Sequence, residues 1–132
     1  MSTAANYAST PKQGIAAIAT ANTAKDGTGV MGTVLTAGAN GSRIDAITIK
    51  ATGTTTAGAI RLFIHNGATA YLLSEIPVVA VTSSATAPSF ELNLNTNTMT
   101  QMLPIILPTG YSLRASTNNA ENFNVLAQGG DF

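Results

Sequence analysis

The stretch from Ser42 to Ile76 decides the fold class; it reads SRIDAITIKA (42–51), TGTTTAG (52–58), AIRLFIH (59–65), NGAT (66–69) and AYLLSEI (70–76). Three apolar runs rich in β-branched and aromatic residues are separated by clusters of Gly, Thr and Asn. Such runs, bounded by turn-forming residues, are typical of β-strands. The stretch therefore predicts three antiparallel strands joined by turns.

The middle run shows the alternation most directly. Ile60, Leu62 and Ile64 fall on one face of an extended chain, and Arg61 and Phe63 fall on the other. Successive side chains of a strand point to opposite faces, so this order predicts a strand buried on one side and partly covered on the other. The Asn-Gly pair at 66–67 predicts the turn that follows, because both residues tolerate positive φ.

The rest of the chain continues the pattern and predicts about eight strands in all. Alternation is clear in segments 89–95, 111–116 and 123–127, and 30–36 also predicts a strand, with Gly32 as a candidate bulge. Segment 14–20 fits either a strand or a helical turn. Near Asp45 the alternation slips by one residue, which predicts a β-bulge at Asp45-Ala46.

These elements predict an all-β protein, an antiparallel β-sandwich with a jelly-roll-like arrangement. Residues 14–132 form one sandwich domain, and residues 1–13 form an extended N-terminal arm, either frayed or ordered on a neighbouring subunit with Tyr7 as its anchor. The single-domain prediction agrees with the length of 132 residues.

Composition narrows the classes of function. Six basic and six acidic residues cancel, and charged residues make up only 9% of the chain. This balance argues against binding nucleic acid or an anionic membrane surface. No apolar run approaches the roughly 20 residues of a membrane span, and the first residues lack a secretory signal, so we expect synthesis in a cytoplasm. A neutral surface of Thr, Ser, Asn and Ala favours a subunit packed against copies of itself or a larger assembly.

The candidate chemistry is sparse. His65 is the only histidine and the chain has no cysteine, so the sequence predicts neither a metal site nor a cofactor. Asp26-Gly27-Thr28-Gly29 is interpreted as a turn, because a phosphate loop needs a Gly-Lys-Ser/Thr step into a helix. The six acids form no recognisable catalytic pair, and we expect no enzymatic activity.

Three groups of segments resemble small virion proteins of tailed bacteriophages. They are TANTAKDGTG (20–29) with TAGANGSRID (36–45), IKATGTTTAG (49–58) with RLFIH (61–65), and LPTGYSLRAS (107–116). The resemblance runs from about Pro11 to the end of the chain. It implies a capsid decoration (cement) protein with a β-sandwich fold, often a trimer, on the outer capsid surface and in contact with the major capsid protein.

The hypothesis is therefore a non-enzymatic virion subunit, made in the host cytoplasm, that stabilises the assembled shell. Two alternatives stay open, a tail, collar or fibre-associated virion protein and a receptor- or glycan-binding β-sandwich module, although no Trp is present to stack on a sugar. The resemblance carries over no functional residue. The candidate interface residues are Tyr7, Pro11, Arg43, Arg61, Arg114 and Phe132.

Overall fold

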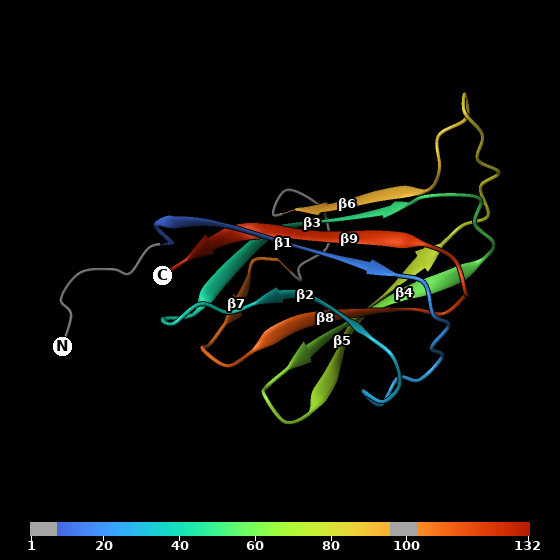
Figure 1. The fold of residues 1–132 in the computed structure, drawn as a ribbon. Helices are drawn as coiled ribbons and strands as arrows, with labels where there is room; N and C mark the ends of the chain where they lie inside the picture. Colours follow the sequence, from blue (N-terminus) through green and yellow to red (C-terminus); the bar gives the residue numbers. More distant parts are fainter. Residues whose placement is uncertain (1–7, 96–102) are drawn as a thin grey trace, which may run out of the picture.

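The computed structural model describes residues 8–95 and 103–132, which form nine β-strands and no helix (Figure 1). The strands are β1 (Thr10–Ile18), β2 (Gly32–Thr36), β3 (Ser42–Ala51), β4 (Gly58–His65), β5 (Ala70–Val78), β6 (Glu91–Asn95), β7 (Ile105–Leu107), β8 (Ser112–Thr117) and β9 (Phe123–Asp131). The all-β prediction is confirmed. Within these residues no helix is available that could cross a membrane.

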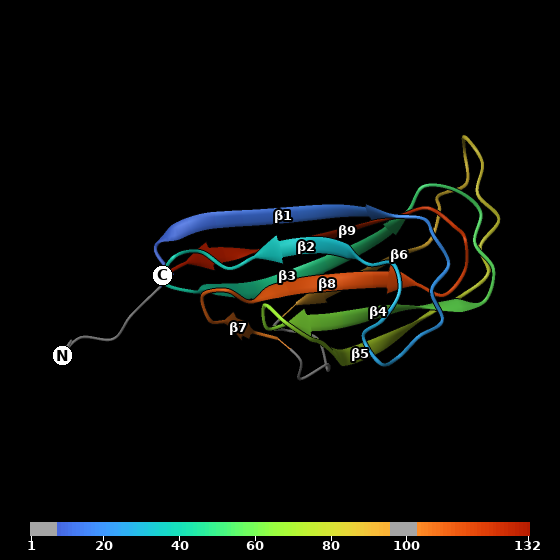
Figure 2. The same ribbon diagram turned by 60° about the horizontal axis from the view of Figure 1, so that its bottom comes forward.

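Two antiparallel sheets form two layers in a sandwich-like arrangement (Figures 1 and 2). The first sheet has the strand order β1-β9-β3-β6, and the short strand β7 pairs with the other end of β3. The second sheet has the order β2-β8-β4-β5. The free edges of the second sheet are therefore β2 and β5.

Pairing between strands is nested along the sequence. The first strand pairs with the last (β1 with β9), β2 pairs with β8, β3 pairs with β6, and β4 pairs with β5. Lateral pairs of β3 with β9 and of β4 with β8 complete the two sheets. Most ladders thus join residues far apart in the chain, and only β4 and β5 form a local hairpin.

The two sheets approach most closely where β1 runs beside β2. A Cβ added to Gly14 on β1 would lie 2.0 Å from the carbonyl oxygen of Val34 on β2. A side chain larger than hydrogen does not fit this space, which explains the glycine at this position.

The 42–76 stretch forms its three expected strands but divides them between the two sheets. β4 and β5 form the predicted hairpin around Asn66-Gly67, where Gly67 has a φ of +95° and Asn66 Oδ1 accepts hydrogen bonds from the amides of Ala68 and Thr69. β3 instead belongs to the first sheet, and segment 52–57 crosses between the layers. The pairing partners of β3 are β6, β7 and β9, which all come later in the chain.

The core lies between the layers and is built from the predicted inward faces. Ile47 and Ile49 of β3, Leu62 of β4 and Val125 of β9 are fully buried. Phe90 and Phe123 meet edge to face, with ring centroids 6.5 Å apart. Burial of such side chains contributes about 1.5–3 kcal/mol each, which makes this layer the main source of stability.

Two expectations about local structure are corrected. β1 begins at Thr10, so residues 10–13 belong to the first sheet and not to the N-terminal arm; an edge strand tolerates Pro11 because its missing amide removes no bond from a central ladder. The bulge expected at Gly32 lies instead between Thr33 and Leu35. The bulge at Asp45-Ala46 is confirmed, since the register of β3 against β9 shifts between Ile44 and Ala46.

Candidate functional site

The structure brings some of the candidate interface residues together and separates others: Pro11 and Arg43 flank Gly130 of β9, two residues before Phe132, whereas Arg61 and Arg114 belong to the second sheet. Pro11 and Arg43 are exposed on strands of the first sheet, Arg114 is half-buried on β8, and Phe132 is half-buried after β9. Tyr7, the expected anchor of the arm, lies outside the described residues. Arg61, also expected at an interface, is buried.

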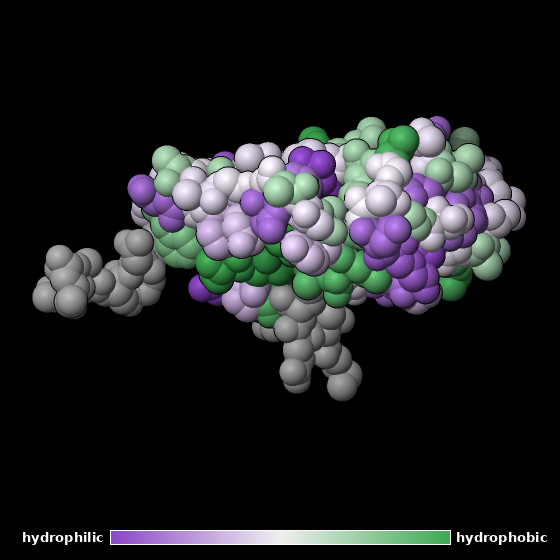
Figure 3. Space-filling view, turned by 90° about the horizontal axis from the view of Figure 1, so that it is seen from below, coloured by the Kyte–Doolittle hydropathy of each residue, from purple (hydrophilic) through white to green (hydrophobic). Residues whose placement is uncertain are grey.

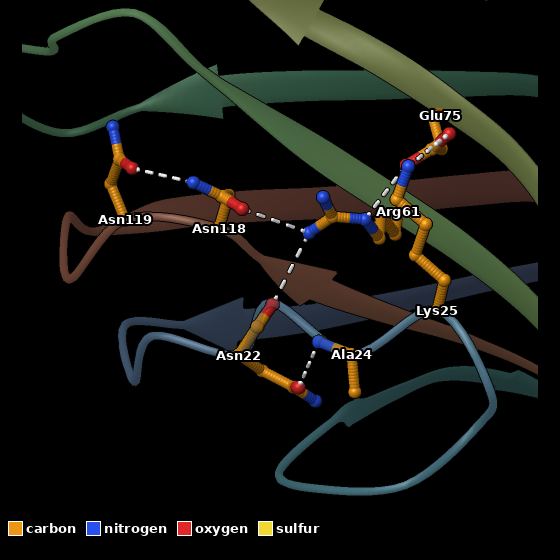
Figure 4. A network of polar contacts seen from close by, with 7 residues as sticks. All are labelled: Asn22, Ala24, Lys25, Arg61, Glu75, Asn118 and Asn119. Atoms are coloured by element: carbon orange, nitrogen blue, oxygen red, sulfur yellow. Dashed lines mark hydrogen bonds and ion pairs between the residues drawn. The ribbon is translucent and has the colours of Figure 1, made fainter.

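Arg61 is buried, with 6% of its surface exposed, so it is not a surface residue, and its guanidinium lies in a network of polar contacts (Figure 4). Its Nε donates to Glu75 Oε1 at 2.9 Å, and its Nη1 donates to the carbonyl oxygen of Asn22 at 3.3 Å and to Asn118 Oδ1 at 3.1 Å. Lys25 Nζ lies 3.2 Å from the same Glu75 oxygen. A buried charge needs such partners, and here they join three separate segments.

The Arg61 network holds the long connection between β1 and β2 against the second sheet. The Asn22 side chain organises that connection, because its Nδ2 donates to the carbonyl oxygens of Thr28 and Val30 and its Oδ1 accepts from the amide of Ala24. The amide of Asn22 also bonds the carbonyl oxygen of Thr117 at the end of β8. Arg61 therefore has a structural role, which explains why β4 is covered on both faces.

A polar cleft lies between this connection and the β4–β5 turn; we call it the Arg114 cleft. It has a volume of about 500 Å³ and is lined by segments 26–31 and 68–70 together with His65 and Arg114. His65 ends β4, and its Nδ1 accepts a hydrogen bond from the amide of Gly67. The cleft thus gathers side chains from three places in the sequence.

The charges of the Arg114 cleft differ from those elsewhere in the described residues. The described residues include six Lys and Arg side chains, of which five pair with a carboxylate and Arg114 does not. Its one hydrogen bond within the described chain runs from Nε to Ser112 Oγ at 3.4 Å. Asp26 also has no cationic partner within residues 8–95 and 103–132. Hydrogen bonds from the Thr28 hydroxyl and, second, from the Thr28 amide lower the pKa of Asp26 below its ordinary 3.8.

The outer face of the first sheet carries a second hollow of about 570 Å³, lined by segments 11–13, 45–46 and 128–129. Pro11 lines this hollow, and so does Asp45, which forms an ion pair with Arg43, with Nε and Oδ1 2.6 Å apart. Its two charged side chains, Lys12 and Asp45, are each paired with an opposite charge of the same chain. This hollow therefore presents fewer unpaired charged side chains to a ligand than the Arg114 cleft does.

Asp131 is tied to both neighbouring strands. The Ser42 hydroxyl donates to one Asp131 oxygen, and Lys12 Nζ lies 3.3 Å from the carboxylate. The Ser42 hydrogen bond, and second the Lys12 ammonium, lower the pKa of Asp131 below its ordinary 3.8. This carboxylate locks β9 between β1 and β3.

An apolar depression of about 460 Å³ surrounds Phe132, between segments 40–41 and 106–108. Ile106 beside it is 54% exposed. Phe132 is therefore part of a small hydrophobic area, and its amide is fixed by a hydrogen bond to the carbonyl oxygen of Gly41.

The free edge strand β5 exposes three consecutive apolar residues that the sequence analysis did not single out. Tyr71, Leu72 and Leu73 are 58%, 37% and 40% exposed. In Figure 3, which views the molecule from the side of β5, hydrophobic residues gather in a band along this face. The signal was present, because three apolar residues in a row cannot all point inward from a strand.

Neither a metal-ligating cluster among the described residues nor a match to a known protein points to another site. Within residues 8–95 and 103–132 no three His, Cys, Asp or Glu side chains gather closely enough to hold a metal ion. No family model, no curated protein and no solved structure matches this chain. The function is therefore argued from the fold and its surfaces.

Proposed function

We propose that this chain is a non-enzymatic structural subunit of a phage virion, a capsid decoration protein that binds the major capsid protein on the outer surface of the shell. The observation that carries the proposal is the exposed apolar edge at Tyr71, Leu72 and Leu73 on β5. Natural proteins usually blunt or cover a free sheet edge, so an apolar one indicates a partner.

The strand pairing supports a jelly-roll assignment. Apart from the short β7, eight strands form two sheets of four, and the first half of the chain pairs with the second half in reverse order. A long hairpin rolled into two layers produces this nesting. Jelly rolls are common in viral capsid proteins and also in lectins, so the assignment supports the proposal by analogy.

The charge pattern agrees with attachment through many neutral contacts. Most basic side chains are neutralised within the protomer, which leaves little positive charge for nucleic acid. A protein that binds only the assembled shell stabilises the shell by mass action, and repetition over the shell strengthens modest contacts. A trimer would cover the β5 edges in a closed ring.

The proposal is tested with expanded shells assembled from the major capsid protein encoded with this chain. We expect the purified protein to co-sediment with these shells and to raise their resistance to heat. Leu73→Lys should weaken binding by about tenfold, because it places a charge on the apolar edge. Ile15→Lys on β1, where Ile15 is 61% exposed, is the matched control and should bind normally.

Two results would contradict this function. The protein would be a tail, collar or fibre component if it co-purified with tails and ignored shells. Equal binding by Leu73→Lys and the unsubstituted protein would remove the β5 edge from the contact.

A further inference from the structure

The Arg114 cleft presents charged groups that the fold leaves without partners. The terminal nitrogens Nη1 and Nη2 of Arg114 have no hydrogen-bond acceptor within the described residues, while the other five basic side chains have a carboxylate. A half-buried guanidinium is an effective partner for a planar anion, because it donates two parallel hydrogen bonds. The first requirement for a ligand is therefore a carboxylate-like group.

The other polar groups of the cleft limit the charge of that ligand. The ionised Asp26 carboxylate lines the same cleft, and only its Oδ1 accepts the bonds from Thr28. The negative charge of Asp26 would repel a phosphate dianion. The second oxygen of the Asp26 carboxylate can instead accept hydrogen bonds from hydroxyl groups of a ligand. Thr69 adds a hydroxyl group, and His65 adds its Nε2 atom, which has no hydrogen-bond partner among the described residues. The part of the ligand that enters the cleft should thus offer one carboxylate and several hydroxyl groups.

The remaining lining is apolar or without side chains. Val30, 60% exposed, and Met31 supply hydrophobic surface. Gly27 and Gly29 adopt φ values of +87° and +84°, and their lack of side chains lets a ligand approach the backbone. A sugar ring matches this mixture, since it presents C–H groups beside its hydroxyl groups. A volume of about 500 Å³ lies within the usual range for small-ligand sites.

We propose that the Arg114 cleft binds an acidic saccharide, with the uronate carboxylate on Arg114 and sugar hydroxyl groups on Asp26 and the neighbouring threonine. This binding role goes beyond the structural role proposed above, and none of Tyr71, Leu72 and Leu73 lines the cleft. An extracellular acidic polysaccharide is the class of ligand that such a site would recognise.

The test is an NMR titration of the ¹⁵N-labelled protein with trigalacturonate, with neutral maltotriose as the comparison sugar. We expect trigalacturonate to shift the amide signals of Gly27, Gly29 and Thr69, and maltotriose to shift them far less. Arg114→Gln should weaken binding by about tenfold or more, because it removes the charge and keeps a polar side chain. Arg43→Gln, at an exposed arginine on the first sheet, should bind like the unsubstituted protein.

A second variant keeps the test valid if Arg114→Gln folds poorly. Val30→Asp changes an exposed side chain at the cleft and should weaken trigalacturonate binding by charge repulsion, with no change in unfolding temperature. The proposal is overturned by equal shifts with maltotriose, by no shift with trigalacturonate, or by inorganic phosphate binding as tightly as trigalacturonate. Failure here would leave shell binding through β5 unaffected, so the two functions are tested separately.

Discussion

Arg61 carries a positive charge into the interior, where loss of water disfavours an ion unless hydrogen bonds compensate for it. Its three acceptors belong to Glu75 on β5, to Asn22 on the β1–β2 connection and to Asn118 after β8. The residue therefore ties three segments together. Arg61 was expected at the surface because the alternation of β4 alone does not show what covers the strand. The β1–β2 connection that covers Arg61 has no periodic pattern from which its position could be predicted.

Substituting Arg61 should destabilise the protein. Arg61→Leu leaves the Asn22 carbonyl oxygen and the Asn118 side chain without their donor, and we expect a loss of about 2–4 kcal/mol in the free energy of unfolding. Arg43→Leu, which removes an exposed ion pair, should cost less than about 1 kcal/mol. Urea unfolding of both variants checks this, and equal losses would contradict the structural role of Arg61.

Asp131 predicts the acid behaviour of the protein. Its pKa in the folded state lies below the unfolded value because of the Ser42 hydrogen bond and then Lys12, so its stabilising contribution is complete above the ordinary pKa of 3.8. That contribution is lost as the pH falls through the folded pKa. Asp131→Asn should therefore make stability less dependent on pH in the acid range.

Ser42→Ala provides an independent check on the same group. Removal of the hydroxyl donor should raise the pKa of Asp131 toward 3.8, as measured by NMR titration of the carboxyl carbon. An unchanged pKa would show that Ser42 does not hold the carboxylate.

At the scale of elements, the faces of the strands could be predicted and their partners could not. The inward faces of 89–95 and 123–127 and the bulge at Asp45-Ala46 follow from a period of two, which depends only on neighbouring residues. One partner of β3 is β9, which begins more than 70 residues after β3 ends, and no local pattern encodes that choice. The Arg114 cleft was missed for the same reason, because three distant segments line it.

The contact between β1 and β2 predicts a strongly position-dependent effect of a single methyl group. Gly14→Ala would place a Cβ 2.0 Å from the Val34 carbonyl oxygen, so the two strands must separate. We expect a loss of at least about 1–3 kcal/mol in stability. Gly53→Ala is the matched control, since nothing lies within 4 Å of its added Cβ, and thermal unfolding should separate the two variants clearly.

At the scale of the whole molecule, the boundary of β1 determines how the N-terminal arm can be tested. Removal of residues 1–13 also removes Thr10–Gln13 from their ladder with β9 and breaks the Lys12 ion pair. We therefore expect this deletion to lower the unfolding temperature, whereas removal of residues 1–7 takes away no residue of β1. An arm that binds the shell predicts that the 1–7 deletion weakens shell binding while leaving the unfolding temperature unchanged.

The place of β9 has a consequence for how the chain is made. Residues 123–131 lie between β1 and β3, although both of those strands leave the ribosome much earlier. Until that segment emerges, β1 and β3 lack the strand that pairs with both of them, and the first sheet cannot form. We therefore expect the two sheets to fold only after residues 123–131 have emerged from the ribosome. Translation that stalls earlier should leave an unfolded chain that proteases and chaperones recognise.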